Sequence, residues 1–304
     1  MKSIVLEKKS YTAVDDLYKD LDNKFKELEI SEDDIYELHI QNSFLTDLAL
    51  DYEENDKLKN CIKLVIKSTK ITGVIISKFK NVFRYIHISD CDIIQSTIYD
   101  CDFYRGLSAD EDYFTNSVFF VDCKFRSAVI TKCNFINLSF ERCFMLRSLN
   151  SISENTIESL DLLDTQVFSI VSTGNKFGGI NIVDCVFLTV GNSIISDFNV
   201  KDINTLHSSV FNGNPVFNED CYTASTIDKP IRNIYYFPKS NIIKAFIDRI
   251  YLNMNEIFET NKHTWSLEEF EYAISEIESR NEKLASCYRD IINYFKAIKK
   301  QYKE

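Results

Sequence analysis

The 304-residue sequence predicts a mainly β protein with some α structure, in which a coiled parallel β-solenoid lies between a small N-terminal α/β cap and a C-terminal helical region. Three patterns predict it: a five-residue repeat in the middle of the chain, short alternating apolar segments before it, and helical periodicity at both ends. They divide the chain into a cap at 1–35, a solenoid at 36–213, a proline-containing connector at 214–239 and a helical domain at 240–304.

The N-terminal cap is expected to contain a short strand and one helix. Leu17, Leu21, Phe25 and Leu28 are spaced by four, four and three residues, which places them on one helical face. Residues 1–60 contain 16 Asp and Glu against 8 Lys, so most of the net charge of −11 lies there. We interpret this acidity as a solvated surface, with a docking surface for a basic partner as the alternative.

The solenoid is predicted first by alternation and then by a period of five. From Tyr36 onward, apolar pairs such as Leu38 with Ile40 and Leu64 with Ile66 recur between polar residues, as in short strands. From Val118 the chain reads VFFVD CKFRS AVITK CNFIN LSFER CFMLR, with apolar residues in the first and third places of each pentad. Helices repeat every 3.6 residues and strands every 2, so a period of five requires a corner every five residues.

Four such sides make one turn of roughly twenty residues, and successive turns stack at the strand spacing of ~4.8 Å. Residues twenty apart are then expected to stack, with Phe120 over Phe140 and Cys123 over Cys143, while Cys133 lies on the opposite face. The predicted solenoid core consists of Cys91, Ile93, Ile98, Cys101, Phe103, Phe120, Cys123, Phe125, Ile130, Cys133, Phe135, Phe140, Cys143, Met145, Cys185 and Phe187.

These pentads resemble those of pentapeptide-repeat proteins, whose unit is a small residue, Asp or Asn, Leu or Phe, and two variable residues. Cys101-Asp102-Phe103 and Cys133-Asn134-Phe135 match the unit, whereas Arg142-Cys143-Phe144-Met145 departs from it at the acid or amide place. Clear matches cover roughly 91–105 and 118–147. The resemblance implies a right-handed quadrilateral β-helix. Residues 286–300 are also similar to a helical segment that follows the repeats in some family members.

The best-known activity of that family is inhibition of type II topoisomerases by a β-helix that mimics DNA. Such mimicry needs rows of outward acidic side chains that imitate phosphates. Over 118–147 the outward places hold five basic residues, Lys124, Arg126, Lys132, Arg142 and Arg147, against two acidic ones, Asp122 and Glu141. This balance argues against mimicry in that stretch, and the acidic chain as a whole disfavours nucleic acid as a partner.

The sequence predicts no catalytic, cofactor-binding or metal-binding site, and the protein is expected not to be an enzyme. The cysteines of the repeat lie five and ten residues apart rather than in CxxC pairs, and we interpret them as buried, reduced core residues. The four histidines are scattered, and no phosphate-binding loop occurs. Without a signal peptide or a run of ~18 apolar residues, we expect a cytoplasmic, bacterial protein with no membrane span.

The last part of the chain is predicted to be helical after the three prolines at 215, 230 and 238. Ser266 and Glu269 form a capping-box pattern. Beyond it, steps of four and three residues define a heptad seam, which consists of Phe270, Ile274, Ile277, Asn281, Leu284, Tyr288, Ile291, Phe295, Ile298 and Tyr302. The seam predicts either a coiled coil that forms an oligomer or docks a protein partner, or an amphipathic helix packed on its own chain.

The sequence therefore predicts a non-enzymatic protein–protein interaction scaffold. Its β-helix would present a rigid surface, and its C-terminal helices would mediate oligomerisation or docking. The alternatives are a DNA-mimicking inhibitor of a type II topoisomerase and the cytosolic part of a bacterial defence or effector system.

Overall fold

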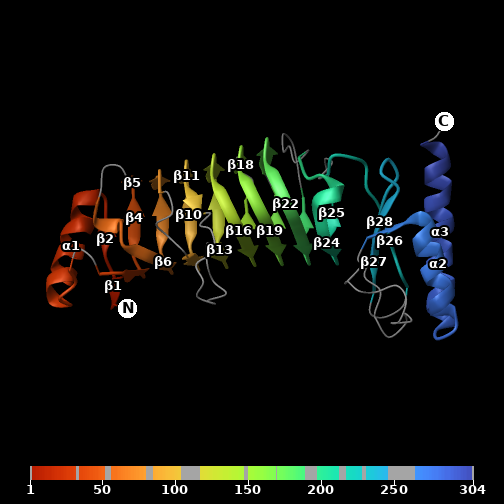
Figure 1. The fold of residues 1–304 in the computed structure, drawn as a ribbon, viewed down its shortest axis with the longest axis horizontal. Helices are drawn as coiled ribbons and strands as arrows, with labels where there is room; N and C mark the ends of the chain where they lie inside the picture. The colour runs from red at the N-terminus through yellow and green to blue at the C-terminus, as the bar shows by residue number, and fades with distance from the viewer. Residues whose placement is uncertain are drawn as a thin grey trace.

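In the computed structural model the chain forms an elongated parallel β-solenoid, followed by a smaller sheet with two helices packed on it (Figure 1). The predicted β-helix is thereby confirmed. The two termini lie at opposite ends of the molecule (Figure 1). The structure describes residues 2–31, 34–51, 56–79, 85–103, 117–146, 150–168, 170–188, 197–211, 217–227, 231–245 and 264–302.

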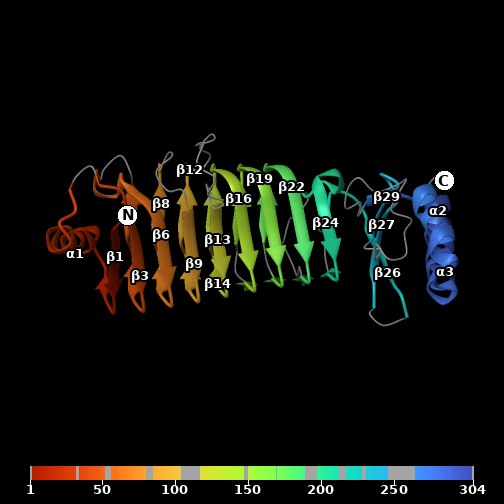
Figure 2. The same cartoon turned by 60° about the horizontal axis from the view of Figure 1, so that its bottom comes forward.

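Three parallel sheets form the sides of the solenoid. The first sheet, seen face-on in Figure 2, contains β1 (Lys2–Glu7), β3 (Tyr36–Gln41), β6 (Cys61–Lys67), β9 (Tyr85–Ser89), β13 (Ser117–Val121), β16 (Asn134–Glu141), β19 (Thr156–Leu163), β22 (Lys176–Val183) and β24 (Ile203–His207), with β12 (Asp102–Phe103) paired to β16. The second contains β2 (Ser10–Tyr11), β4 (Phe44–Thr46), β7 (Lys70–Thr72), β10 (Asp92–Ile94), β14 (Lys124–Arg126), β17 (Phe144–Met145), β20 (Gln166–Val167), β23 (Val186–Phe187) and β25 (Val210–Phe211). The third contains β5 (Ala49–Asp51), β8 (Ile75–Ser77), β11 (Thr97–Tyr99), β15 (Val129–Thr131), β18 (Ser151–Ser153) and β21 (Val171–Thr173). Two short 3₁₀ helices span Asp56–Leu58 and Val200–Asp202.

The aromatic residues of the repeat stack inside the solenoid. Phe120 of β13 pairs in register with Phe140 of β16, and their rings are stacked with centroids 5.1 Å apart and planes at 10°. The Phe125 ring of β14 meets both edge-on, at centroid distances of 5.1 and 5.5 Å. The expected stacking of residues twenty apart therefore forms the centre of the core, where offset and edge-to-face rings pack favourably.

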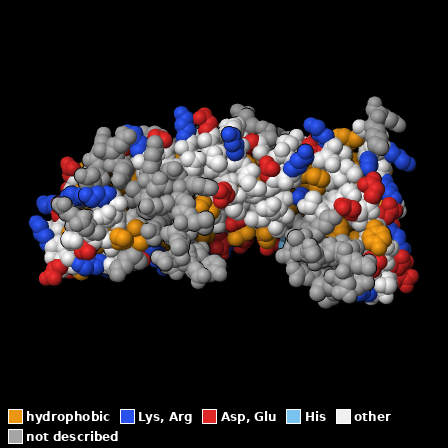
Figure 3. Space-filling view, in the orientation of Figure 1, with side chains coloured by type: hydrophobic (Ala, Val, Ile, Leu, Met, Phe, Trp, Pro, Cys, Tyr) orange, Lys and Arg blue, Asp and Glu red, His pale blue; other side chains and the backbone are white. Residues whose placement is uncertain are grey.

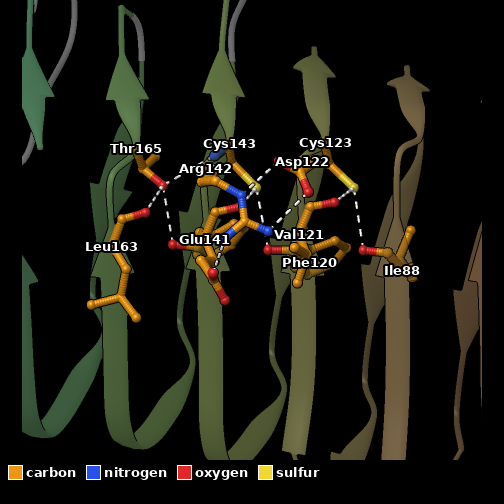
Figure 4. A network of polar contacts seen from close by, with 11 residues as sticks. Ile88, Phe120, Val121, Asp122, Cys123, Glu141, Arg142, Cys143, Leu163 and Thr165 are labelled. Carbon is orange, nitrogen blue, oxygen red and sulfur yellow. Dashed lines mark hydrogen bonds and ion pairs between the residues drawn. The ribbon is translucent and has the colours of Figure 1, made fainter.

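After the first turn, where Lys9 follows Lys8, each described corner between the first and second sheets consists of a residue with positive φ followed by a small side chain that can donate a hydrogen bond. Asp122 has a φ of 55°, and the next residue, Cys123, donates its thiol to the carbonyl oxygens of Val121 and Ile88, both at 3.3 Å (Figure 4). Thr165 donates in the same way to the carbonyl oxygens of Leu163 and Phe140. The same corner position is occupied by Ser43, Thr69, Cys91, Cys123, Cys143, Thr165, Cys185 and Ser209.

These contacts explain the first place of the pentad. A thiol or hydroxyl there donates to carbonyl groups beside the turn, such as that of Val121, which also accepts from the Asp90 backbone N–H at 3.0 Å. The buried side-chain donor is thereby satisfied, and successive turns are linked. Cys133 lies at a different corner, between the third sheet and the start of β16, where it donates to the Thr131 carbonyl oxygen at 3.2 Å. It thus lies away from Cys123, as the twenty-residue period predicts.

The ladder of the first sheet begins earlier than residue 36. β1 pairs in parallel with β3, with Ile4 opposite Leu38, so residues 2–7 already form a side of the solenoid. Helix α1 (Val14–Glu27) lies outside the ladder, and its Leu17 and Leu21 are buried in the solenoid core. The alternation of buried Ile4 and Leu6 with outward residues is a strand pattern, but a single short strand does not reveal its neighbour.

The second unit is an antiparallel sheet of β26 (Tyr222–Ser225), β27 (Asn233–Phe237), β28 (Ile242–Ala245) and β29 (Thr264–Ser266), with α2 (Leu267–Glu278) and α3 (Glu282–Gln301). Strand β27 faces two cores. Tyr235 and Phe237 belong to the solenoid core, whereas Ile234 and Tyr236 belong to the core beneath the helices. Two of these strands lie in the segment predicted as a connector, and the sheet covers the end of the solenoid.

The predicted seam is divided between α2 and α3. Asn281 is the N-cap of α3, and its side chain accepts a hydrogen bond from the Leu284 backbone N–H at 3.0 Å. The other seam residues are buried in one core with Trp265 and the sheet, except Tyr302, which is 42% exposed. The seam is therefore interrupted at Asn281, and its buried residues pack within the chain's own second unit. The capping box of Ser266 and Glu269 is present.

The aromatic stack predicts the effect of truncating one ring. Replacing buried Phe140 by Ala (Phe140→Ala) removes contacts with Phe120 and Phe125 and leaves a cavity, so the free energy of unfolding should fall by ~3–5 kcal/mol. Urea unfolding followed by circular dichroism measures it. Tyr272→Ala, at an exposed site on α2, is the control and should change stability by less than ~0.5 kcal/mol. Equal effects of the two variants would contradict the stack's importance.

The contact between the cap sheet and the last solenoid turn gives a second prediction. The Tyr235 hydroxyl accepts from the Ser209 N–H and donates to the Ser209 carbonyl oxygen, both at 2.7 Å, in a buried site. Tyr235→Phe leaves both groups unpaired and should lower the free energy of unfolding by ~1–3 kcal/mol. Tyr236→Phe loses one hydrogen bond of 3.5 Å to the Asn241 side chain and should lower the free energy of unfolding far less. A thermal melt in which the two variants behave alike would refute this role for Tyr235.

Candidate functional site

The predicted core residues all lie inside the solenoid where their side chains are described. Cys91, Ile93, Ile98, Cys101, Phe120, Cys123, Phe125, Ile130, Cys133, Phe135, Phe140, Cys143, Met145, Cys185 and Phe187 are buried, while the side chain of Phe103 lies outside the described part of the chain. Burial raises the pKa of Cys61 to about 12 and that of Cys185 to about 11. Burial therefore favours the neutral thiol at these two positions, as in apolar core packing.

The His, Cys, Asp and Glu side chains of the described residues have the chemistry of metal ligands, and their positions decide whether they form a site. No group of three or more His, Cys, Asp or Glu side chains in those ranges is placed to hold a metal ion. His39 contacts Glu37 at 3.1 Å, His87 contacts the Tyr85 hydroxyl at 3.3 Å, and His263 lies outside the described residues. Neither α1, α2 nor α3, as described, is long and apolar enough to cross a membrane.

A cleft of about 710 Å³ lies between the end of the solenoid and the cap sheet. The Lys244 ammonium lines it and donates to the Ile203 carbonyl oxygen and, at 2.6 Å, to the Thr264 hydroxyl. Burial lowers the pKa of Lys244 to about 8. Because one of these partners lies on β24 and the other on β29, Lys244 joins the solenoid to the cap, and we assign it a structural role.

The most distinctive surface is on the outward side of the second sheet. On its strands the middle residue points inward, and its two neighbours point outward. On β7, β10 and β14 these outward residues are mostly polar or charged: Lys70, Thr72, Asp92, Ile94, Lys124 and Arg126. Beyond them the character changes. We call the following set the apolar strip: Phe144, Leu146, Phe168, Val186, Leu188 and Val210.

The apolar strip is partly exposed and rests on a fixed backbone. Val210 is 51% exposed, and the Phe144 and Phe168 rings are stacked with centroids 5.9 Å apart. The ladder continues past the ends of the short strands, because the Leu146 N–H donates to the Phe125 carbonyl oxygen at 3.1 Å and the Leu188 N–H to the Val167 carbonyl oxygen at 2.8 Å. Gln166 is the single polar outward residue among the described positions of these strands.

A row of charged residues, each directly before one of the small corner residues, borders the strip; we call it the corner row. The backbone N–H of each residue bonds to the next turn. That of Asp122 donates to the Glu141 carbonyl oxygen, and that of Asp164 donates to the Val183 carbonyl oxygen. The row consists of Asp90, Asp122, Arg142, Asp164 and Asp184, all with positive φ. Asp164 and Asp184 are exposed and form no ion pair with another described residue.

Arg142 is engaged within this row. Its guanidinium donates to both carboxylate oxygens of Asp122, at 2.8 and 2.9 Å, and also contacts Glu141 (Figure 4). The hydrogen bond from Arg142 lowers the pKa of Asp122. The positive charge of Arg142 is thus compensated on the surface, and Asp164 and Asp184 remain as the carboxylates beside the strip.

The basic surface predicted over 118–147 is largely compensated in the structure. The Arg126 Nε lies 3.7 Å from an Asp92 carboxylate oxygen, and the Lys132 Nζ lies 4.0 Å from a Glu154 carboxylate oxygen. Arg147 lies outside the described residues. Figure 3 shows one face of the molecule, on which the described acidic and basic side chains are interspersed. The partners are about one turn apart in sequence, which is why a local count of charges missed them.

The comparisons with known proteins add little to this picture. No family model matches the sequence, and no curated protein matches it. Among solved structures, trypsin-treated QnrB1, a plasmid-mediated fluoroquinolone resistance protein, aligns with 12% sequence identity and a TM-score of 0.24. The alignment covers 69% of this chain and 92% of that chain. A likeness at this level carries no functional inference, and the class of protein, a capped parallel β-solenoid, rests on the strand pairing.

Proposed function

We propose that this protein is a non-enzymatic scaffold that binds a protein partner through the apolar strip. The observation that carries the proposal is the run of apolar outward residues on four successive strands, β17, β20, β23 and β25, next to charged outward residues on the same sheet. Contiguous apolar patches on soluble domains commonly mark interaction sites. A hydrogen-bonded sheet presents such a patch with little ordering left to occur on binding.

The C-terminal helices are a weaker docking surface than the strip. Their seam is buried between the two helices and against the chain's own sheet, and their outer side carries ion pairs, Glu271 with Lys296 at 2.6 Å and Glu268 with Lys299 at 2.9 Å. We therefore assign partner binding to the solenoid and covering of its end to the helical unit. Nine free cysteines support a reducing compartment such as the bacterial cytoplasm. The proposal also includes membership of the pentapeptide-repeat family.

A charge placed in the strip tests the scaffold role. Val186→Lys and Val210→Lys should reduce capture of a specific protein from a bacterial lysate at least tenfold, because an unpaired ammonium would be buried at the interface. Val171→Lys, at a half-buried outward position on the third sheet, is the matched control. Quantitative mass spectrometry of the captured proteins, with thermal melts of all variants, gives the readout. Capture that is unchanged in both strip variants would refute the strip as the docking surface.

A specific observation also favours a second candidate, a DNA-mimicking inhibitor of a type II topoisomerase. The corner row places Asp90, Asp122, Asp164 and Asp184 along one edge of a rod, with turns ~4.8 Å apart. Arg142 interrupts this row and neutralises part of it, which is why mimicry ranks second.

If mimicry operates, the purified protein should inhibit supercoiling by a bacterial type II topoisomerase, and Asp164→Asn with Asp184→Asn should relieve the inhibition, because fewer phosphate-like charges remain. A gel-based supercoiling assay measures the effect, with Glu154→Gln, at an exposed position of another corner, as control. No inhibition at protein concentrations well above that of the enzyme would discard this candidate.

A further inference from the structure

We infer that the partner segment bound by the apolar strip is an amphipathic helix with Lys or Arg along one flank. This inference rests on the proposed scaffold function and specifies the chemistry of the partner. Three features of the described residues support it: the pairing of the strands, the spacing of the strip and the charge on its border.

Along β17, β20 and β23 the strand pairing leaves no open edge for a partner that adds a β-strand. β17, β20 and β23 are each hydrogen-bonded to a strand on both sides. Their backbone N–H and C=O groups are already used in the ladder, whereas β-augmentation needs an open sheet edge. The partner must therefore contact side chains on the face of the sheet.

The spacing of the strip suits a helix that lies along the solenoid axis. Neighbouring strands are ~4.8 Å apart, and successive turns of an α-helix are ~5.4 Å apart, so the mismatch over three intervals is only about 2 Å. The rows Phe144, Gln166, Val186 and Val210, and Leu146, Phe168 and Leu188, run in this direction. One apolar side chain per helical turn can thus meet one outward residue per strand.

The described border of the strip, at the corner between the first and second sheets, favours one charge on the helix flank that faces it. Asp164 and Asp184 are exposed, lie on neighbouring turns, and directly precede the corner residues of β20 and β23. Side chains at positions i and i+4 of a helix are ~6 Å apart, so two cations with that spacing can meet both carboxylates. Asp122 is already engaged by Arg142. A basic flank is therefore complementary to this border, and an acidic flank is repelled.

Two synthetic peptides test the inference on the full-length chain. Each has about 14 residues, four helical turns, and a stripe of Leu; one carries Lys and Arg on the flank and the other carries Glu at the same places. Fluorescence anisotropy should show at least tenfold tighter binding of the basic peptide, with an affinity that falls as salt rises. Val210→Lys should abolish binding.

Variants of the border separate its charge from its shape. Asp164→Asn with Asp184→Asn should weaken binding of the basic peptide about fivefold and flatten its salt dependence, while Glu154→Gln should leave it unchanged. Equal binding of both peptides, or tighter binding of the acidic one, would overturn the charge assignment and leave the scaffold function standing.

The remaining outcomes also discriminate. If neither peptide binds while Val186→Lys still abolishes capture of a protein partner, the helical class is wrong and the scaffold function stands. If capture is also unchanged, both proposals fail. If light scattering shows a dimer that Val210→Lys dissociates, the occupant of the strip is a second copy of the chain, which overturns the inference.

Discussion

The hydrogen bond at the corner between the first and second sheets is the contact on which the solenoid depends. Each turn directs a small polar side chain into the interior, and a buried thiol or hydroxyl without an acceptor is costly. Cys143 and Thr165 donate to carbonyl oxygens of the turn they close and of the neighbouring turn, and so tie the two turns together. With each corner fixed, registers such as Phe120 with Phe140 follow, and so do the positions that face outward.

The period of five contained enough information to predict the coil and its interior. The stacking of Phe120 on Phe140 follows from the spacing alone, because one turn takes about twenty residues there. The same spacing could have predicted the pairing of Arg142 with Asp122, twenty residues apart, but charges counted along the chain do not reveal partners on neighbouring turns. The apolar strip could also have been found by reading the residue after each corner residue, as Phe144 follows Cys143.

The ends of the solenoid were harder to predict, for a physical reason. Periodicity reports which face of an element is apolar but not what covers that face. The heptad spacing from Phe270 correctly indicated an apolar helical face, yet that face is covered by the neighbouring helix and by the sheet that contains Tyr236. Likewise, Asn281 lies at a seam position in the sequence but serves as the N-cap of α3. A polar residue within an apolar period can either fix the register of a coiled coil or mark the boundary between two helices.

Strand β27, with one side in each core, also limits how the molecule can grow. A parallel solenoid has an unpaired strand edge at each end, and such edges can recruit further strands from other molecules. Here α1 packs at one end and the sheet that contains Tyr235 covers the other. Packing at both ends disfavours end-to-end recruitment of strands from further molecules, so the ends of the stack serve a different purpose from its sides.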